Sequence, residues 1–198
     1  MSATRFAATV SYDGTAFAGS QIQPNVRTVQ QVLETAAGVL FGSPTRVELA
    51  GRTDSGVHAI GQVAAFSAET RHAAETVRKA LNANLPEDVS VRAVRAVPAG
   101  FDPRRWARKR WYRYTIANGE AREPLTRRGA WFVEGNLDVR AMQAAAQALA
   151  GKRAVALPLY SAEPQHDLAR FARSFCRELF AVLPRDTAGN LVNWVKAI

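Results

Sequence analysis

The spacing of apolar residues in the first hundred positions predicts strands that alternate with two helices. Apolar and polar residues alternate over residues 5–12, as in a strand with one buried face. Over residues 28–41 the apolar positions recur at helical spacing, and Thr28 and Gln31 have the spacing of a capping box. The other expected elements are strands over 47–50, 62–67 and 89–97 and a helix over 73–83 that stops before Pro86. This β-α-β-β-α-β order is that of a ferredoxin-like domain.

The second half of the chain begins in the same way and does not complete the pattern. Its expected elements are strands over 111–117, 129–133, 177–183 and 191–197 and a helix over 137–150. If this half repeats the first, its closing helix and strand are missing. An apolar face would then be uncovered and a sheet edge unpaired, which is a liability for a monomer.

Composition and charge restrict the possible partners. The chain has 198 residues, is 47% hydrophobic and carries a net charge of +9, which favours a nucleic acid or an anionic membrane surface. A single cysteine excludes an internal disulfide and any metal site that needs several cysteines. No apolar run approaches the ~18 residues of a membrane span, and the first residues do not resemble a signal peptide. We therefore expect a soluble, cytoplasmic protein.

The positive charge is concentrated in one aromatic-rich stretch. Six of the ten residues from 104 to 113 are basic, and Trp106, Trp111, Tyr112 and Tyr114 are interleaved with them. Cations neutralise phosphates and aromatic faces stack on exposed bases, which suits RNA better than lipid. An alternating strand could also direct the aromatic side chains into a core and the cations into water. Both interpretations stay open at this point.

The stretch Ala50-Gly51-Arg52-Thr53-Asp54-Ser55-Gly56-Val57-His58-Ala59 contains the strongest candidate chemistry. It presents Arg52 and Asp54, two positions apart, in a glycine-flanked turn just after an apolar strand. Glycine allows a tight turn and a close approach to a ligand, and loops between rigid strands often present catalytic groups. Asp, Ser and Gly are also good turn formers, so an ordinary hairpin turn is the alternative.

This stretch resembles the A-G-R-T-D-x-G-V-H signature of the TruA family of tRNA pseudouridine synthases. Further matching segments, in family order, lie at residues 12–15, 28–30, 61–63, 81–86 and 112–114. The resemblance covers about residues 5–150. It implies an α+β pseudouridine synthase fold, in which two ferredoxin-like halves share a mostly antiparallel sheet. Here the halves would be domains 1–103 and 104–198, the second of them incomplete.

The family resemblance implies conversion of uridine to pseudouridine in the anticodon stem-loop of tRNA. Asp54 would be the nucleophile that attacks uracil C6 or ribose C1′, and neither a cofactor nor a metal would be needed. Arg52 would help to extrude the base, and Tyr112 would stack on it and take part in proton transfer. The alternatives are that Arg52 anchors a phosphate and that Tyr112 packs in the core. His58 is interpreted as a packing residue of the loop.

Other positions are expected to grip the RNA. Phe101, Arg104 and Arg105 fall where the family has an RNA-contacting F-x-x-R stretch, and His72 falls near another contact. Arg110 belongs to the basic stretch. The resemblance also implies tRNA as the partner, a homodimer whose second subunit helps to hold the tRNA, and no membrane. The main alternative is a catalytically impaired tRNA-binding protein on the same scaffold, and a third is a general basic RNA-binding module.

The sequence departs from the family in three places. Gly19-Ser20-Gln21 replaces the family's G-W-Q, and residues 153–158 replace its D-F-S-x-F segment. The motif F-x-H-H-M-V-R-N, expected after residues 195–197, is absent, and with it the arginine that pairs with the catalytic aspartate. Three explanations are open: a shortened sequence, a divergent copy that binds RNA without catalysis, or replacement of that arginine by Arg104 or Arg110.

Overall fold

The computed structural model describes residues 3–108, 110–113, 115–140, 142 and 196–197. The chain divides into two compact units, one of Met1–Tyr114 with Val195–Ile198 and one of Thr115–Trp194. No helix among the described residues has the length and apolar character needed to cross a bilayer.

The first unit is built on a sheet in which β1 is central. Its elements are β1 (Thr4–Tyr12), the 3₁₀ turn η1 (Gly14–Ala16), α1 (Val29–Phe41), β2 (Glu48–Leu49), β3 (Ala59–Ala68), α2 (Ala74–Asn84), β4 (Val89–Val97), β5 (Tyr112–Arg113) and β8 (Lys196–Ala197). Strand β1 pairs antiparallel with both β3 and β4, and β2 pairs antiparallel with β3. Beyond β3 the sheet continues through β8 to β5. The predicted β-α-β-β-α-β order of the first half is confirmed.

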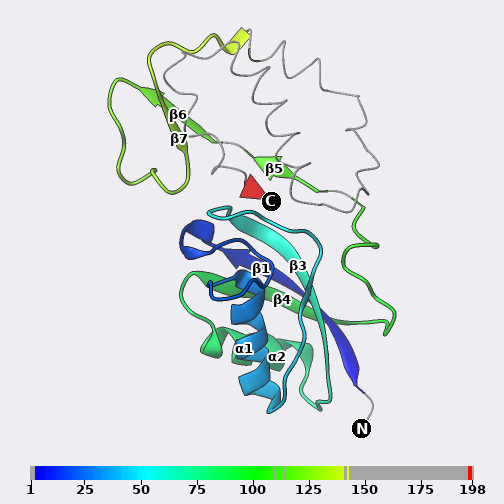
Figure 1. Cartoon of the computed structure of the whole chain (residues 1–198). Helices are drawn as coiled ribbons and strands as arrows, with labels where there is room; N and C mark the ends of the chain where they lie inside the picture. The colour runs from blue at the N-terminus through cyan, green and yellow to red at the C-terminus, as the bar shows by residue number, and fades with distance from the viewer. Residues whose placement is uncertain (1–2, 109, 114, 141, 143–195, 198) are drawn as a thin grey trace. The chain divides into compact units, whose positions relative to one another are not determined.

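Helices α1 and α2 cover one face of this sheet (Figure 1). Alternate residues of β1 point at the helices, and Phe6, Ala8 and Val10 are at most 2% exposed. Leu33 of α1 and Leu81 of α2 pack into the same cluster. Each fully buried side chain of this kind contributes about 1.5–3 kcal/mol. The helix layer therefore stabilises a rigid sheet, whose strand ends carry the candidate site.

The helix ends follow local sequence signals. Thr28 precedes α1, and its hydroxyl accepts a hydrogen bond from the Gln31 N–H at 3.3 Å. Gly42, with φ 68°, ends the helix in the left-handed conformation that glycine adopts readily. Asn82 of α2 joins the helix to β4, because its side chain bonds both the N–H and the C=O of Val91 at 2.8 Å.

One expectation for the second half of the sequence, a continuous strand over 111–117, was wrong. The strand expected over 111–117 is two short strands with different partners, separated by Thr115, which is not in a strand. Strand β5 pairs with β8 in the first unit, whereas β6 (Ile116–Gly119) pairs in parallel with β7 (Trp131–Glu134). Strand β7 largely confirms the strand expected over 129–133.

Several expectations for the second half fall on residues outside the described ranges. Val139, Arg140 and Met142 are helical, as expected for the start of the helix over 137–150. The rest of that helix, the strand over 177–183 and most of the strand over 191–197 lie outside the described residues. The repeat of a ferredoxin-like second half and the domains 1–103 and 104–198 therefore stay predictions.

Candidate active site

The loop between β2 and β3 carries Arg52 and Asp54. The loop leaves the sheet at Ala50, whose N–H donates to the Val63 carbonyl at 2.8 Å. Asp54 then opens a tight turn that closes when the Val57 N–H donates to the Asp54 carbonyl at 3.2 Å. The side chains of Arg52 and Asp54 are exposed, and neither forms a hydrogen bond or an ion pair with any described residue. The Asp54 carboxylate is therefore accessible to a ligand.

The loop is held on the N-terminal side of Asp54 by contacts with Thr53. The Ser20 N–H donates to the Thr53 carbonyl at 2.9 Å, and the Ser20 hydroxyl accepts from the Thr53 N–H at 2.8 Å. The hydroxyl groups of Tyr12 and Thr53 lie 2.8 Å apart. Ser20 is fully buried. Because these contacts fix the backbone and the side chain of Thr53, the position before Asp54 has little freedom.

The loop is also held on the C-terminal side of Asp54. The Phe17 carbonyl accepts hydrogen bonds from the Gly56 N–H and from the Ser55 hydroxyl, both at 3.2 Å. Gly14 packs so closely on this side that a Cβ built there would lie 1.9 Å from the Val57 carbonyl oxygen. Since no side chain fits in that space, the segment that follows β1 requires glycine here. The Asp54 turn is thus clamped between Thr53 and Val57.

Two titratable side chains next to the loop, the buried Tyr12 and the half-buried His58, make polar contacts. Burial raises the pKa of the Tyr12 hydroxyl, and hydrogen bonding to Thr53 and Gln62 opposes that rise. His58 Nδ1 lies 3.1 Å from an Asp13 carboxylate oxygen and 3.3 Å from the Gly14 nitrogen. A neutral ring accepts from the Gly14 N–H, and a protonated ring pairs with Asp13. Either contact supports the interpretation of His58 as a packing residue of the loop.

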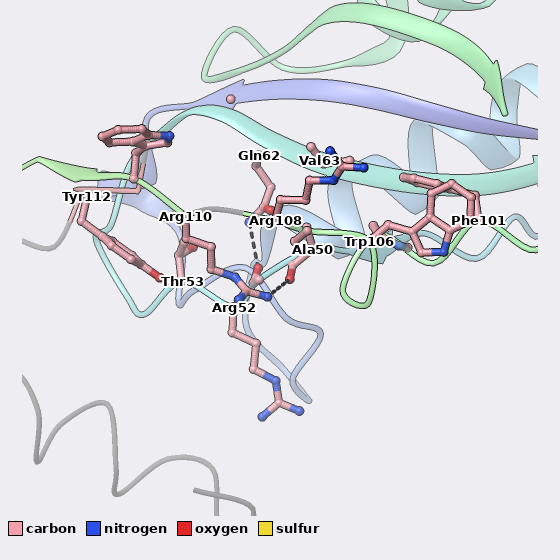
Figure 2. Close-up of a pocket in the computed structure, with 15 residues that line it drawn as sticks. Ala50, Arg52, Thr53, Gln62, Val63, Phe101, Trp106, Arg108, Arg110 and Tyr112 are labelled. Carbon is pink, nitrogen blue, oxygen red and sulfur yellow. Dashed lines mark hydrogen bonds between the residues drawn. The ribbon is translucent and has the colours of Figure 1, made fainter. Parts of the chain in front are cut away.

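A pocket of about 300 Å³ adjoins the loop (Figure 2). Its residues come from the loop, from the first half of β3, and from the basic aromatic stretch with the residues just before it: Ala50, Gly51, Arg52, Thr53, Gly61, Gln62, Val63, Phe101, Pro103, Trp106, Ala107, Arg108, Arg110, Trp111 and Tyr112. Two hydrogen bonds join its parts, from Arg110 to the Ala50 carbonyl at 3.1 Å and from Gln62 to the Gly51 carbonyl at 2.8 Å. The basic stretch is therefore attached to the base of the loop.

The pocket gathers half of the site residues expected from the sequence. Arg52, Phe101, Arg110 and Tyr112 line it, whereas Asp54 lies one residue beyond its border. Tyr112 is 51% exposed, so the alternative that it packs in the core is wrong. The same holds for Trp106 and Trp111, which are 55% and 66% exposed.

The other expected RNA contacts lie outside the pocket. Arg104 donates from Nε to the Leu49 carbonyl at 3.1 Å, so part of its side chain supports β2. Arg105 is 86% exposed and lies 3.5 Å from an Asp102 carboxylate oxygen. Backbone hydrogen bonds from Arg105 and Arg104 lower the pKa of Asp102. His72 is exposed in the loop before α2.

The sequence did not reveal the residues that hold the loop. Ser20, Tyr12 and Phe17 all lie at least 33 positions before their partners in the loop. The departure Gly19-Ser20-Gln21 marks this segment in the sequence but does not indicate that Ser20 bonds Thr53. The one available signal was the turn-forming Asp13-Gly14 pair directly after β1. Among the described residues no three His, Cys, Asp or Glu side chains are placed to bind a metal ion together.

Comparison with known proteins finds one family. Residues 8–104 match the family described as tRNA pseudouridine synthase. A relative from Geotalea uraniireducens (strain Rf4), named tRNA pseudouridine synthase A, is 39% identical over 179 residues, which are 87% of this chain and 68% of the relative. A relative of the same name from Myxococcus xanthus is 38% identical over 197 residues, which are 96% of this chain and 69% of the relative.

A third relative of that name, from Roseiflexus sp. (strain RS-1), is 49% identical over 142 residues, which are 72% of this chain and 53% of the relative. The chain thus spans between about half and about two thirds of the length of the curated relatives that it matches.

Proposed function

We propose that this chain, which belongs to the tRNA pseudouridine synthase A family, converts uridine to pseudouridine in the anticodon stem-loop of tRNA. The observation that carries the proposal is the accessibility of the Asp54 carboxylate on a loop whose backbone is held in place. This carboxylate is exposed and has no partner among the described residues, although the backbone on both sides is held by hydrogen bonds. An accessible carboxylate on a backbone that is held in place can attack an electrophilic carbon without a rearrangement of the loop.

In the proposed reaction Asp54 forms a bond to C6 of uracil or to C1′ of the ribose. The bond between N1 and C1′ breaks, the uracil rotates, and C5 bonds to C1′. The proton on C5 leaves, N1 takes up a proton, and the Asp54 carboxylate is released. The product is an isomer of the substrate, so the reaction requires no oxidant, reductant or donated group. For this reason we propose that the enzyme uses no cofactor.

Two neighbours of Asp54 have proposed roles in this reaction. Tyr112 lines the pocket beside Thr53 and is 51% exposed, so its ring is accessible for stacking on an extruded uracil. Its hydroxyl group is proposed to take part in proton transfer from C5. Arg52 extends away from the other labelled side chains in Figure 2 and is proposed to help extrude the target base.

The charge distribution supports an RNA partner. The chain carries a net charge of +9, and the basic residues of the stretch from 104 to 113 alternate in sequence with the exposed Trp106, Trp111 and Tyr112. Arg104, Arg105, Arg110, Phe101 and His72 are proposed RNA contacts. The homodimer and the cytoplasmic location stay predictions from the sequence.

One observation favours a second candidate, a tRNA-binding protein that does not catalyse. No cationic side chain among the described residues pairs with Asp54. A guanidinium group beside a carboxylate favours its charged form and orients its oxygens. Without such a group the Asp54 carboxylate would be a weaker nucleophile.

Mapping of pseudouridine in unmodified tRNA separates the two candidates. The tRNA is incubated with the chain, and pseudouridine is located by carbodiimide labelling and primer extension. Product that disappears in Asp54→Asn supports the synthase. Binding of tRNA without product supports the second candidate, and the absence of both binding and product contradicts both.

The matched control is Glu87→Gln, which also neutralises one carboxylate. Glu87 is exposed in the turn between α2 and β4 and does not line the pocket. The synthase proposal expects Glu87→Gln to form product at the parental rate. Equal losses in the two variants would attribute the effect to charge in general and not to Asp54.

A further inference from the structure

We propose that the Phe101–Trp106 end of the pocket beside the Asp54 loop binds an unpaired nucleotide of the RNA other than the target uridine, while Tyr112 at the opposite end serves the target. This inference rests on the proposed function, because it takes RNA as the partner. The pocket shares Arg52 and Thr53 with the loop and ends one residue before Asp54. A nucleotide at the Phe101–Trp106 end therefore leaves both Tyr112 and the Asp54 carboxylate to the target.

The aromatic residues of the pocket suit a nucleobase. Trp106 and Phe101 lie at one end of the labelled group and Tyr112 at the other (Figure 2). The Trp106 ring makes an edge-to-face contact with Phe101, with ring centroids 5.3 Å apart, and the backbone N–H of Trp106 donates to the Asp102 carbonyl at 3.0 Å. Trp106 is nevertheless 55% exposed. An indole ring that is held in place and open to solvent is a stacking platform for a base.

The position of Phe101 is itself fixed from the sheet. Arg5 of β1 donates to the Phe101 carbonyl from Nε at 3.3 Å and from a terminal nitrogen at 3.1 Å. Arg5 is also ion-paired with Glu48 of β2. The platform formed by Phe101 and Trp106 is thus tied to two strands, which lowers the entropy lost when a base binds.

The charges of the pocket suit a phosphate. Arg52, Arg108 and Arg110 line it, and no lining residue among those described is acidic. The Arg108 guanidinium forms no hydrogen bond or ion pair with any described residue, and Arg110 uses one donor on the Ala50 carbonyl. Their remaining donors are available for charge-assisted hydrogen bonds to phosphate oxygens. The pocket combines aromatic faces for stacking with guanidinium groups that form no ion pair with a described residue. Such a site is better suited to bind a single-stranded nucleotide than to bind an apolar surface of another protein.

The test combines a change in the protein with a change in the RNA. A panel of anticodon stem-loops is made, each with one abasic nucleotide in the loop, and the Kd is measured for the parent chain and for Trp106→Ala. We expect Trp106→Ala to raise the Kd for the intact stem-loop by about tenfold. An abasic nucleotide at one loop position should raise the Kd of the parent chain by a similar factor. The same abasic stem-loop should bind Trp106→Ala with the Kd of the intact stem-loop, because that variant already lacks the stacking ring. Trp106→Phe should recover most of the affinity.

A second variant tests the phosphate contact independently. Arg108→Gln should reduce the slope of log K against log salt by about 0.7. Lys79→Ala is the matched control, because Lys79 is an exposed cation on α2 that does not line the pocket. It should leave both the Kd and the slope near their parental values.

Three results would overturn the inference. The first is a Kd of Trp106→Ala within twofold of the parent. The second is an effect of every abasic position that simply adds to the effect of Trp106→Ala. The third is coupling to Trp106→Ala only at the uridine that is converted to pseudouridine, which would assign the site to the target itself. A changed oligomeric state of Trp106→Ala with unchanged RNA affinity would identify the patch as a protein interface instead. Product formation is a separate readout. If the parent binds RNA through the pocket and forms no pseudouridine, the proposed function fails while this inference stands.

Discussion

Ser20 and Thr53 are joined by two hydrogen bonds that run in opposite directions. The Ser20 N–H donates to the Thr53 carbonyl at 2.9 Å, and the Ser20 hydroxyl accepts from the Thr53 N–H at 2.8 Å. Ser20 has no exposed surface, so water does not replace its hydroxyl. Since Asp54 follows Thr53 directly, the segment after β1 controls where the carboxylate lies.

Ser20→Ala is therefore expected to affect both stability and catalysis. The change leaves the Thr53 N–H without its acceptor, which costs about 1–3 kcal/mol of unfolding free energy. A small displacement of Asp54 should lower kcat by about ten- to a hundredfold. Urea unfolding and steady-state pseudouridine formation measure the two effects.

The control for Ser20→Ala is Asn82→Ala. The Asn82 side chain also bonds backbone groups, but on the helix side, at Val91. We expect a comparable loss of stability with kcat preserved, at a temperature where both variants are folded. A parental kcat in Ser20→Ala would show that this hydroxyl does not position Asp54.

Alanine substitutions at Gly14 and Gly38 should change the free energy of unfolding in opposite directions. In Gly14→Ala the new Cβ would lie 1.9 Å from the Val57 carbonyl oxygen, so the backbone must move, at a cost of about 1–3 kcal/mol or more. Gly38 lies inside α1, and in Gly38→Ala the Cβ would have one ordinary contact, at 3.7 Å with the Ser43 carbonyl oxygen, so the helix should gain about 0.5–1 kcal/mol. Thermal unfolding followed by circular dichroism compares them. Equal destabilisation would contradict the predicted difference.

Tyr12→Phe should reveal a pH-dependent term in stability. Below about pH 10 the parent should be more stable by about 1 kcal/mol, because Tyr12 and Thr53 share a hydrogen bond. Burial raises the pKa of Tyr12 in the folded state, so between the unfolded and folded pKa values the folded chain binds more protons. The contribution of Tyr12 is therefore lost as the pH rises through the folded pKa.

Urea unfolding of both proteins across the alkaline range measures this term. The stability difference between the parent and Tyr12→Phe should shrink above about pH 10. A constant difference throughout that range would mean that Tyr12 ionises no less readily in the folded chain than in the unfolded chain.

Arg27→Lys tests whether the contact of Arg27 with Phe17 stabilises the segment that holds the Asp54 loop. The two terminal nitrogens of Arg27 bond the two carboxylate oxygens of Asp88 at 2.7 and 2.8 Å, and its guanidinium lies 4.1 Å from the centre of the Phe17 ring. The hydrogen bond with Asp88 raises the pKa of Arg27. Lysine keeps the charge but loses the paired bonds and the flat stacking surface. Because the pair is partly exposed, we expect a loss of only about 0.5–1 kcal/mol in urea unfolding.

Arg78→Lys serves as the comparison for Arg27→Lys. Arg78 also makes paired bonds, to Glu75 one turn away on the surface of α2. Its loss should be smaller, since both residues belong to one helix and no aromatic ring among the described residues lies over the pair. A larger loss in Arg78→Lys would contradict a supporting role for the contact of Arg27 with Phe17.

The first-half elements were predictable because their signals are local. Alternation over a few residues identifies β1 and β4, and the hydroxyl of Thr28 identifies the start of α1. The prediction of one strand over 111–117 was wrong because its signal is not local. Its two parts pair with β8 and with β7, and hydrogen-bonding partners so far away in the chain leave no mark on a local pattern.

The sequence by itself determined which reactive and binding groups are present. These are an Asp54 turn flanked by glycines and a basic stretch rich in aromatic residues, and both contain segments that match one family. Only the tertiary structure decided how these groups are held. It placed Ser20 and Phe17 on either side of the Asp54 turn, and it ended the pocket at Thr53. The physical reason is that one fully buried hydroxyl and one carbonyl act across more than thirty positions, a distance over which neither periodicity nor composition carries information.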